Sequence, residues 1–127
     1  MLPYCIDSGV ACTPYSPLAS GLLCRPQAAG DSKRATTDKV QRTKYYKAGD
    51  DEVCAAVQAI AAERGIPAAQ VALAWLLSKP GVAAPIIGAT KPHHIPDAVA
   101  AIQLKLTDDE VARIEKEYQP HAVSGHA

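Results

Sequence analysis

A phosphate-binding pattern lies in the second half of the chain, where Gly88, Thr90 and Lys91 follow a short apolar run. The run over 82–87 is too short for a helix and ends at glycine, which favours a buried strand. Gly88 permits close approach of the backbone, Thr90 can cap the next helix through its hydroxyl, and Lys91 adds a cation. Because the free N–H groups of a helix N-terminus attract anions, this arrangement predicts a phosphate site. The alternative is an ordinary strand-to-helix turn that binds nothing.

A second pattern of the same kind lies near the N-terminus. The segment 9–15 is a compact strand candidate, and it should end near Pro14 and Pro17 because proline cannot donate to a ladder. A tight loop with two hydroxyls and a glycine follows it. Tyr15, at the carboxyl end of this strand, can present its flat face to a ring, and the alternative is a partly buried packing role.

Helices are predicted between and after the two strands. Asp50 is a good N-cap for a helix over 50–64, and Gly65 ends it. A second helix is predicted over 67–78, and a capping box at 107–110 begins the last helix. Strands that alternate with helices favour parallel βαβ units, an α/β fold that binds ligands at the carboxyl ends of its strands.

Length, composition and charge narrow the functional classes. The chain has 127 residues, which suggests one domain or less, and its 48% hydrophobic content suffices for a core. The formal net charge of zero indicates neither a nucleic-acid partner nor an anionic membrane. No apolar run approaches about 18 residues and no basic-then-apolar leader is present, so we expect a cytoplasmic protein.

Metal and disulfide chemistry are not predicted. No paired C-x-x-C spacing joins the cysteines, which we interpret as free and mostly buried thiols, with a zinc site or disulfide framework as the alternative: Cys5, Cys12, Cys24 and Cys54. His121 and His126 lie in a polar tail without any carboxylate or cysteine pattern that would join them.

A long basic loop is predicted over 24–49, where no sustained periodicity is present. Loops of this length usually have a function or are disordered. The functional interpretation is a lid over an anionic ligand, and the alternative is a solvated loop.

Three segments resemble aldo-keto reductases, and they occur in the order that this family has. Residues 14–23 resemble the family's seventh-strand segment, 69–77 the helix before strand eight, and 85–99 the nucleotide segment of strand eight. The resemblance implies an NADPH-dependent reductase of carbonyl compounds on a (β/α)8 TIM barrel. Since such a barrel needs about 250 residues, we expect 1–127 to form one incomplete domain, roughly the last two βα units and the C-terminal helix.

The resemblance also implies roles in binding NADP(H). Tyr15 would stack on the nicotinamide, while His94 and Asp97 would face the adenine end. The adenosine 2′-phosphate would be held by Gly88, Thr90 and Lys91. The pyrophosphate and adjoining ribose would be wrapped by Ser16, Pro17, Leu18, Ser20 and Gly21, with Leu22 beside them. Arg25 or Arg34 would come from the loop that folds over the dinucleotide.

Two residues depart from the pattern of the family. Ala98 stands where the family usually has an asparagine that contacts adenine. Pro96 falls within the early turns of the helix and removes one backbone bond, so either the helix starts later or its first turn is distorted. The segments that carry the family's catalytic Asp, Tyr, Lys and His are not present, so no catalytic residue is assigned and the isolated chain is expected to be inactive.

Two alternatives to a reductase segment stay open. The chain can be a non-catalytic NADP-binding or interaction module, or an inert truncated fragment. The partner expected in the complete enzyme is a small carbonyl substrate, with no nucleic acid and no membrane. Self-association through exposed strand edges is a further expectation.

Overall fold

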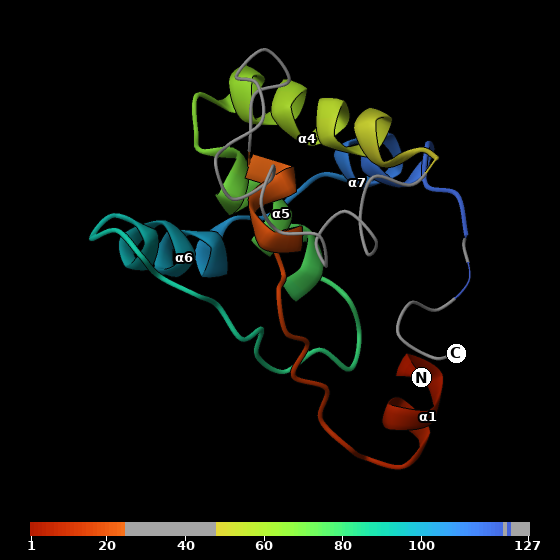
Figure 1. Cartoon of the computed structure of the whole chain (residues 1–127). Coiled ribbons are helices and arrows are strands. Elements are labelled where there is room, and N and C mark those ends of the chain that lie inside the picture. Colours follow the sequence, from red (N-terminus) through yellow and green to blue (C-terminus); the bar gives the residue numbers. More distant parts are fainter. Residues whose placement is uncertain (25–47, 121, 123–127) are drawn as a thin grey trace.

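The computed structural model describes residues 1–24, 48–120 and 122, and the structural statements below concern these residues. Its elements are α1 (Leu2–Asp7), a short 3₁₀ segment η1 (Ala19–Cys24), α4 (Asp50–Arg64), α5 (Ala68–Leu77), α6 (His94–Gln103) and α7 (Asp108–Glu115). Helix α5 packs against both α4 and α6, and α4 also contacts α7 (Figure 1). Helix α1 lies apart from these helices, at the far end of an extended segment.

The hydrophobic core lies where α4, α5 and α7 meet. Val57 and Ile60 of α4 and Val71 of α5 are the largest fully buried side chains. Leu18, which precedes η1, and Leu23, which lies within it, pack against the same cluster. The core therefore anchors the loop for which the sequence predicts ligand binding.

Helices α4 and α5 have nearly the predicted bounds, since α5 covers Ala68–Leu77 where 67–78 was predicted. Helix α4 covers Asp50–Arg64 and ends at Gly65, whose φ of 65° suits glycine at a helix C-cap. The prediction that Asp50 is its N-cap is wrong, because Gly49, with a φ of 88°, caps the helix and Asp50 is its first residue. There Asp50 still favours the helix, since a negative charge in the first turn faces the positive end of the helix dipole.

The predicted capping box of α7 is confirmed. The Thr107 hydroxyl accepts a hydrogen bond from the Glu110 N–H at 3.2 Å, and the Glu110 carboxylate accepts one from the Thr107 N–H at 2.7 Å. The first turn of α7 is therefore closed by both members of the box.

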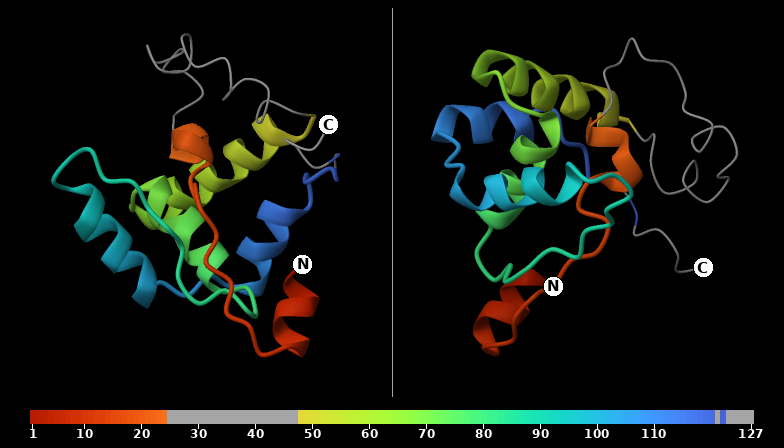
Figure 2. Two further views of the ribbon diagram at one scale, coloured as in Figure 1. Left: turned by 60° about the horizontal axis from the view of Figure 1, so that its bottom comes forward. Right: turned by 90° about the vertical axis from the view of Figure 1, so that its left-hand side faces the viewer.

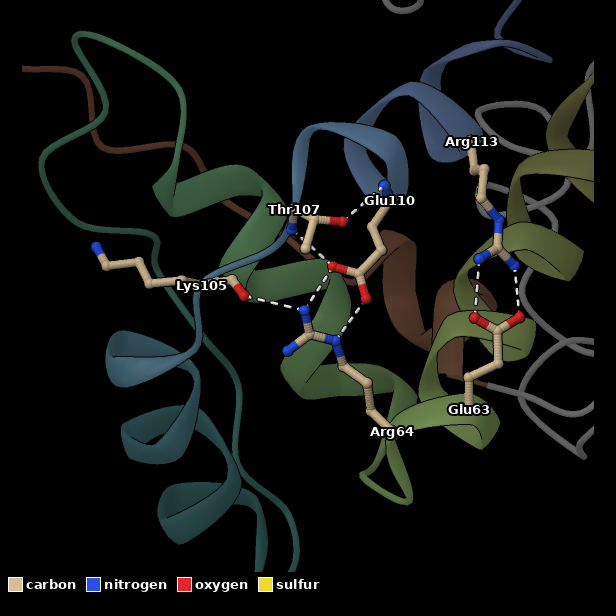
Figure 3. A network of polar contacts seen from close by, with 6 residues as sticks. All are labelled: Glu63, Arg64, Lys105, Thr107, Glu110 and Arg113. Carbon is tan, nitrogen blue, oxygen red and sulfur yellow. Dashed lines mark hydrogen bonds and ion pairs between the residues drawn. The ribbon is translucent and has the colours of Figure 1, made fainter.

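The same carboxylate ties α7 to the end of α4 (Figure 3). The Arg64 guanidinium donates to both oxygens of Glu110 at 2.5 Å and to the carbonyl of Lys105 at 3.1 Å. A second bidentate pair joins Arg113 to Glu63 at 2.6 and 2.8 Å. The pKa of Glu110 is lowered to about 2, chiefly because Arg64 donates hydrogen bonds to it; burial opposes this shift and the bonds with Thr107 support it.

The prediction of two continuous strands is wrong, although their parallel direction is correct. In the described residues the two segments pair only at two isolated parallel bridges, Cys12 with Val82 and Tyr15 with Ile86. Pro14 and Pro85 lie between these bridges and lack the N–H group that would continue the ladder. Figure 2 shows both extended segments rising in the same direction toward the helices.

Several apolar side chains lie uncovered along these segments and on α6. Tyr15 is 69% exposed and Ile86 is 57% exposed, so the bridge that they form has an open face. On α6 the exposed side chains follow helical spacing: Ile95, Val99 and Ile102. None of the helices in the described part of the chain has the length and apolar character needed to cross a membrane.

The ion pair of Glu110 yields a prediction about stability. Glu110→Gln should lower the free energy of unfolding at pH 7 by about 1–3 kcal/mol, because it removes charge-assisted hydrogen bonds from a carboxylate that is only 11% exposed. Urea unfolding followed by circular dichroism measures the loss. Glu63→Gln in the more exposed pair is the matched control and should cost less.

The same prediction has a pH dependence of known sign. Because the pKa of Glu110 is lower in the folded state than its ordinary value of 4.5, its contribution is complete above about pH 5 and is lost as the pH falls toward 2. The free energies of unfolding of the wild type and of Glu110→Gln should therefore converge at low pH. An equal difference at pH 7 and pH 2.5 would contradict this assignment.

Candidate functional site

A groove of about 750 Å³ lies between the two segments for which the sequence predicts ligand binding. One wall is the loop 16–24, the floor comes from α4 and α5, and the other wall runs from Ile87 to the first turns of α6. The carboxyl ends of the two bridged segments thus open into the same groove, as in α/β folds that bind ligands there.

Most of the predicted site residues line this groove. The first segment contributes Ser16, Pro17, Leu18, Ser20 and Gly21, and the second contributes Gly88, Thr90, His94 and Asp97. Three predicted residues are not part of the lining: Tyr15, Leu22 and Lys91. Tyr15 stands immediately before the first wall with its ring exposed, and Lys91 is exposed beside Thr90. Their roles in binding stay predictions.

The first wall has a strained backbone. Ser16, Ala19 and Ser20 have φ values of 50°, 48° and 55°, in the left-handed region that residues with a Cβ rarely adopt. Two turns hold this shape. The Ala19 N–H donates to the Ser16 carbonyl at 2.9 Å, and the Gly21 N–H donates to the Leu18 carbonyl at 2.8 Å. Such strain persists only where surrounding structure enforces it, and it concentrates at ligand sites.

Helix α4 fixes the end of this wall through two side chains that sequence reasoning missed. Gln58 donates from Nε2 to the carbonyl of Leu23 at 3.1 Å, and the Cys54 thiol donates to the carbonyl of Leu22 at 3.8 Å. Burial is the main cause that raises the pKa of the Cys54 thiol to about 11, so it stays a neutral donor. The four-residue spacing of these polar residues on a buried helix face was a usable signal.

The second wall begins differently from the prediction. Thr90 does not cap the helix, because α6 starts at His94 and the Thr90 N–H donates to His94 Nδ1 at 3.2 Å. Pro96 explains the later start. It is the third residue of α6, and the N–H groups of the first turn have no partner within the helix, so the missing N–H of proline costs no hydrogen bond there. An earlier start would place Pro96 in the helix interior, where a hydrogen bond would be lost. Of the two alternatives raised by Pro96, the structure has the later helix.

Two further groups near α6 were missed by sequence reasoning. His93 lines the groove and contacts the His94 ring edge to face, with centroids 4.7 Å apart. Gln70 of α5 donates from Nε2 to Asp97 Oδ1 at 3.1 Å. Ala98 lines the groove beside Asp97, and its methyl group leaves space there.

The groove has the chemistry of a binding site. Its polar groups are hydroxyls, a histidine pair, one carboxylate, the Gln58 amide, the Cys24 thiol and a helix N-terminus. Ala61, Ile66 and Leu73 supply apolar surface. Within residues 1–24, 48–120 and 122, no three His, Cys, Asp or Glu side chains gather in a way that could hold a metal ion. Residues 25–47 of the predicted basic loop, with Arg25 and Arg34, lie outside the described residues, as do the tail histidines His121 and His126.

Comparison with known proteins identifies the class. The model of the aldo/keto reductase family matches residues 1–119, so the chain belongs to this family, as its sequence segments indicated. Two solved members of the barrel class share its fold: a thermostable aldo-keto reductase crystallised with the inhibitor epalrestat (TM-score 0.61, 24% identity, 92% of this chain and 33% of that one), and glycerol dehydrogenase from Gluconobacter oxydans (TM-score 0.67, 22% identity, 100% and 40%). The predicted α/β fold class is thereby confirmed.

Curated relatives are more similar in sequence. The chain is 40% identical over 126 residues to versiconal hemiacetal acetate reductase of Aspergillus parasiticus, covering 97% of this chain and 36% of that protein. It is 39% identical over 131 residues to an aldo-keto reductase of Fusarium vanettenii, covering 100% and 34%. The chain therefore spans about a third of the length of the curated relatives it matches.

The bond from Gln58 predicts how the first wall is held. Gln58→Ala should speed amide hydrogen exchange in residues 18–24, because the Leu23 carbonyl loses its donor, while exchange in α7 should not change. Gln103→Ala, at the exposed end of α6, is the control and should leave residues 18–24 as in the wild type. Unchanged protection of residues 18–24 in Gln58→Ala would mean that the Cys54 bond and the core contacts of Leu18 and Leu23 hold this wall without Gln58.

Proposed function

We propose that this chain is the NADP(H)-binding, C-terminal portion of an aldo-keto reductase that reduces carbonyl compounds to alcohols. The observation that carries the proposal is the single groove into which both predicted segments open. Membership of the aldo/keto reductase family supports it, and the relatives that the chain matches are named as reductases. The span of about a third of those relatives supports a role as one part of a barrel.

The residues of the groove fit an extended dinucleotide. The loop with Ser16, Ser20 and Gly21 would surround the pyrophosphate, since it offers hydroxyls and backbone close to the floor. Tyr15 directly precedes this loop with an exposed ring, which would stack on the nicotinamide. At the opposite wall the start of α6 would attract the 2′-phosphate, with Lys91 beside it as a cation.

The chain would bind and orient, and the cofactor would supply the chemistry. Bound NADPH supplies a hydride to a carbonyl carbon, and the protein decides where the nicotinamide lies. The described residues of this chain are assigned no proton donor for the alcohol oxygen. We place that donor, and the substrate pocket, in the remaining barrel. The remaining barrel would also cover the exposed bridge between Tyr15 and Ile86. Without it, a second copy of the chain would bind to that face.

The 2′-phosphate site predicts selective binding. Lys91→Ala should weaken 2′,5′-ADP about ten- to a hundredfold, because it removes a charged contact to phosphate, and should leave 5′-ADP nearly unchanged. Isothermal titration of the full chain measures both affinities. Lys105→Ala is the matched control, since its side chain points away from the polar network and lies outside the groove (Figure 3). Equal losses for both nucleotides would remove Lys91 from the phosphate site.

Catalysis should require the rest of the barrel. The chain alone should not oxidise NADPH in the presence of 4-nitrobenzaldehyde, because general acid catalysis needs a donor within hydrogen-bonding reach of the substrate oxygen. Absorbance at the NADPH maximum follows the reaction in a sample free of host reductases. Turnover by the chain alone would contradict the proposal of a binding portion. Binding without turnover after co-expression with the remaining barrel of a relative would favour a non-catalytic NADP-binding module.

A further inference from the structure

Part of the groove lining is small or aliphatic and carries one carboxylate. Asp97 of α6 lines the groove beside Ala98, and α5, which packs against α6, contributes Ala69 and Leu73. Small and aliphatic side chains leave room for a planar ring, and a carboxylate accepts hydrogen bonds but cannot donate them. These two helices therefore suit a heteroaromatic ring that carries an amino group.

The Asp97 carboxylate is held from behind by a neighbouring helix. Gln70 of α5 donates from Nε2 to Oδ1 of Asp97 at 3.1 Å, and Gln70 itself does not line the groove. Asp97 is also fixed through its backbone, whose N–H donates to the His93 carbonyl at 3.1 Å. With Oδ1 engaged by Gln70, the orientation of the carboxylate is set and Oδ2 is left for a ligand.

The environment makes this contact worth more than an exposed one. Gln70 and Asp97 are both half-buried, and α5 and α6 pack against each other, with Ala101 of α6 fully buried. A side-chain amide bonded to a carboxylate is a charge-assisted hydrogen bond, which is stronger than a neutral one. The bond therefore ties the orientation of Asp97 to the packing of the two helices.

We infer that Gln70 is a positioning residue that sets nucleobase selection through Asp97. The inference rests on the proposed function, because the ligand class is the dinucleotide. With Oδ2 of Asp97 fixed, the groove selects a base with a 6-amino donor, as in adenine, over one with hydrogen at that position, as in unsubstituted purine. In this chain Gln70 supplies rigidity beside Ala98, whose methyl group makes no hydrogen bond.

The test compares two reduced cofactors that differ only in the 6-amino group of the base. Affinities of the full chain for NADPH and for its purine analogue, in which hydrogen replaces the 6-amino group, are measured by fluorescence titration. The wild type should prefer NADPH about tenfold, which corresponds to one good hydrogen bond. Gln70→Leu should reduce this preference to less than about threefold, because Asp97 can then turn away from the base.

A double mutant separates positioning from a structural role. Asp97→Ala should abolish the preference by itself, and adding Gln70→Leu to Asp97→Ala should change the ratio no further. Gln103→Ala is the control on the exposed end of α6 and should keep the wild-type ratio. Midpoints of urea unfolding establish that each variant is folded when its affinities are compared.

Each outcome decides a different statement. A wild-type ratio that persists in Gln70→Leu would overturn the inference, and so would equal affinities of the wild type for the two cofactors. An effect of Gln70→Leu of the same size with and without Asp97 would assign Gln70 a general structural role and also overturn it. Failure of the wild type to bind NADPH would overturn the proposed function itself, and the inference with it.

Discussion

The contact between α4 and α5 is the constraint on which the rest of the structure depends. Ile60 and Val71 are fully buried in the core that the two helices share. Other residues of the same two helices form the floor of the groove. The first wall reaches the same core through Leu18 and Leu23, and the second wall packs on α5 through α6. Both walls are therefore positioned by one apolar contact, and the polar groups of the groove add orientation to a frame that hydrophobic burial has already set.

The helices could be predicted from sequence because their signals are local. Gly65 ends α4, and the pair Thr107 and Glu110 closes the first turn of α7 through atoms only three residues apart. The prediction of continuous strands failed because strand pairing is not local. A ladder needs an N–H donor on one segment opposite a carbonyl on the other, and Pro14 and Pro85, one on each segment, lack that donor. The predicted start of α6 was too early, because the effect of Pro96 on the first turn outweighed the cap suggested by Thr90.

The residues of the candidate site also fall into those that the sequence indicated and those that it did not. The lining residues came from a resemblance of whole segments, and the structure places most of them around one groove, although their binding roles stay predictions. The residues that hold the walls were missed, because they act across long separations: Gln58 reaches Leu23 over 35 positions and Gln70 reaches Asp97 over 27. A glutamine on a helix gives no sequence signal for such a contact, and only the packing of the helices reveals it.

The shift between the two bridges affects how the first segment can change. Two residues separate Cys12 from Tyr15, whereas three separate Val82 from Ile86, so the partner segment carries one extra residue between the bridges. Such an extra residue bends the segment that carries it. Cys12 is half-buried whereas Tyr15 is exposed, so the two bridged positions of the first segment differ in burial. In terms of mutational tolerance, substitutions at Cys12 and Tyr15 meet different surroundings, so one position is free to vary without constraining the other.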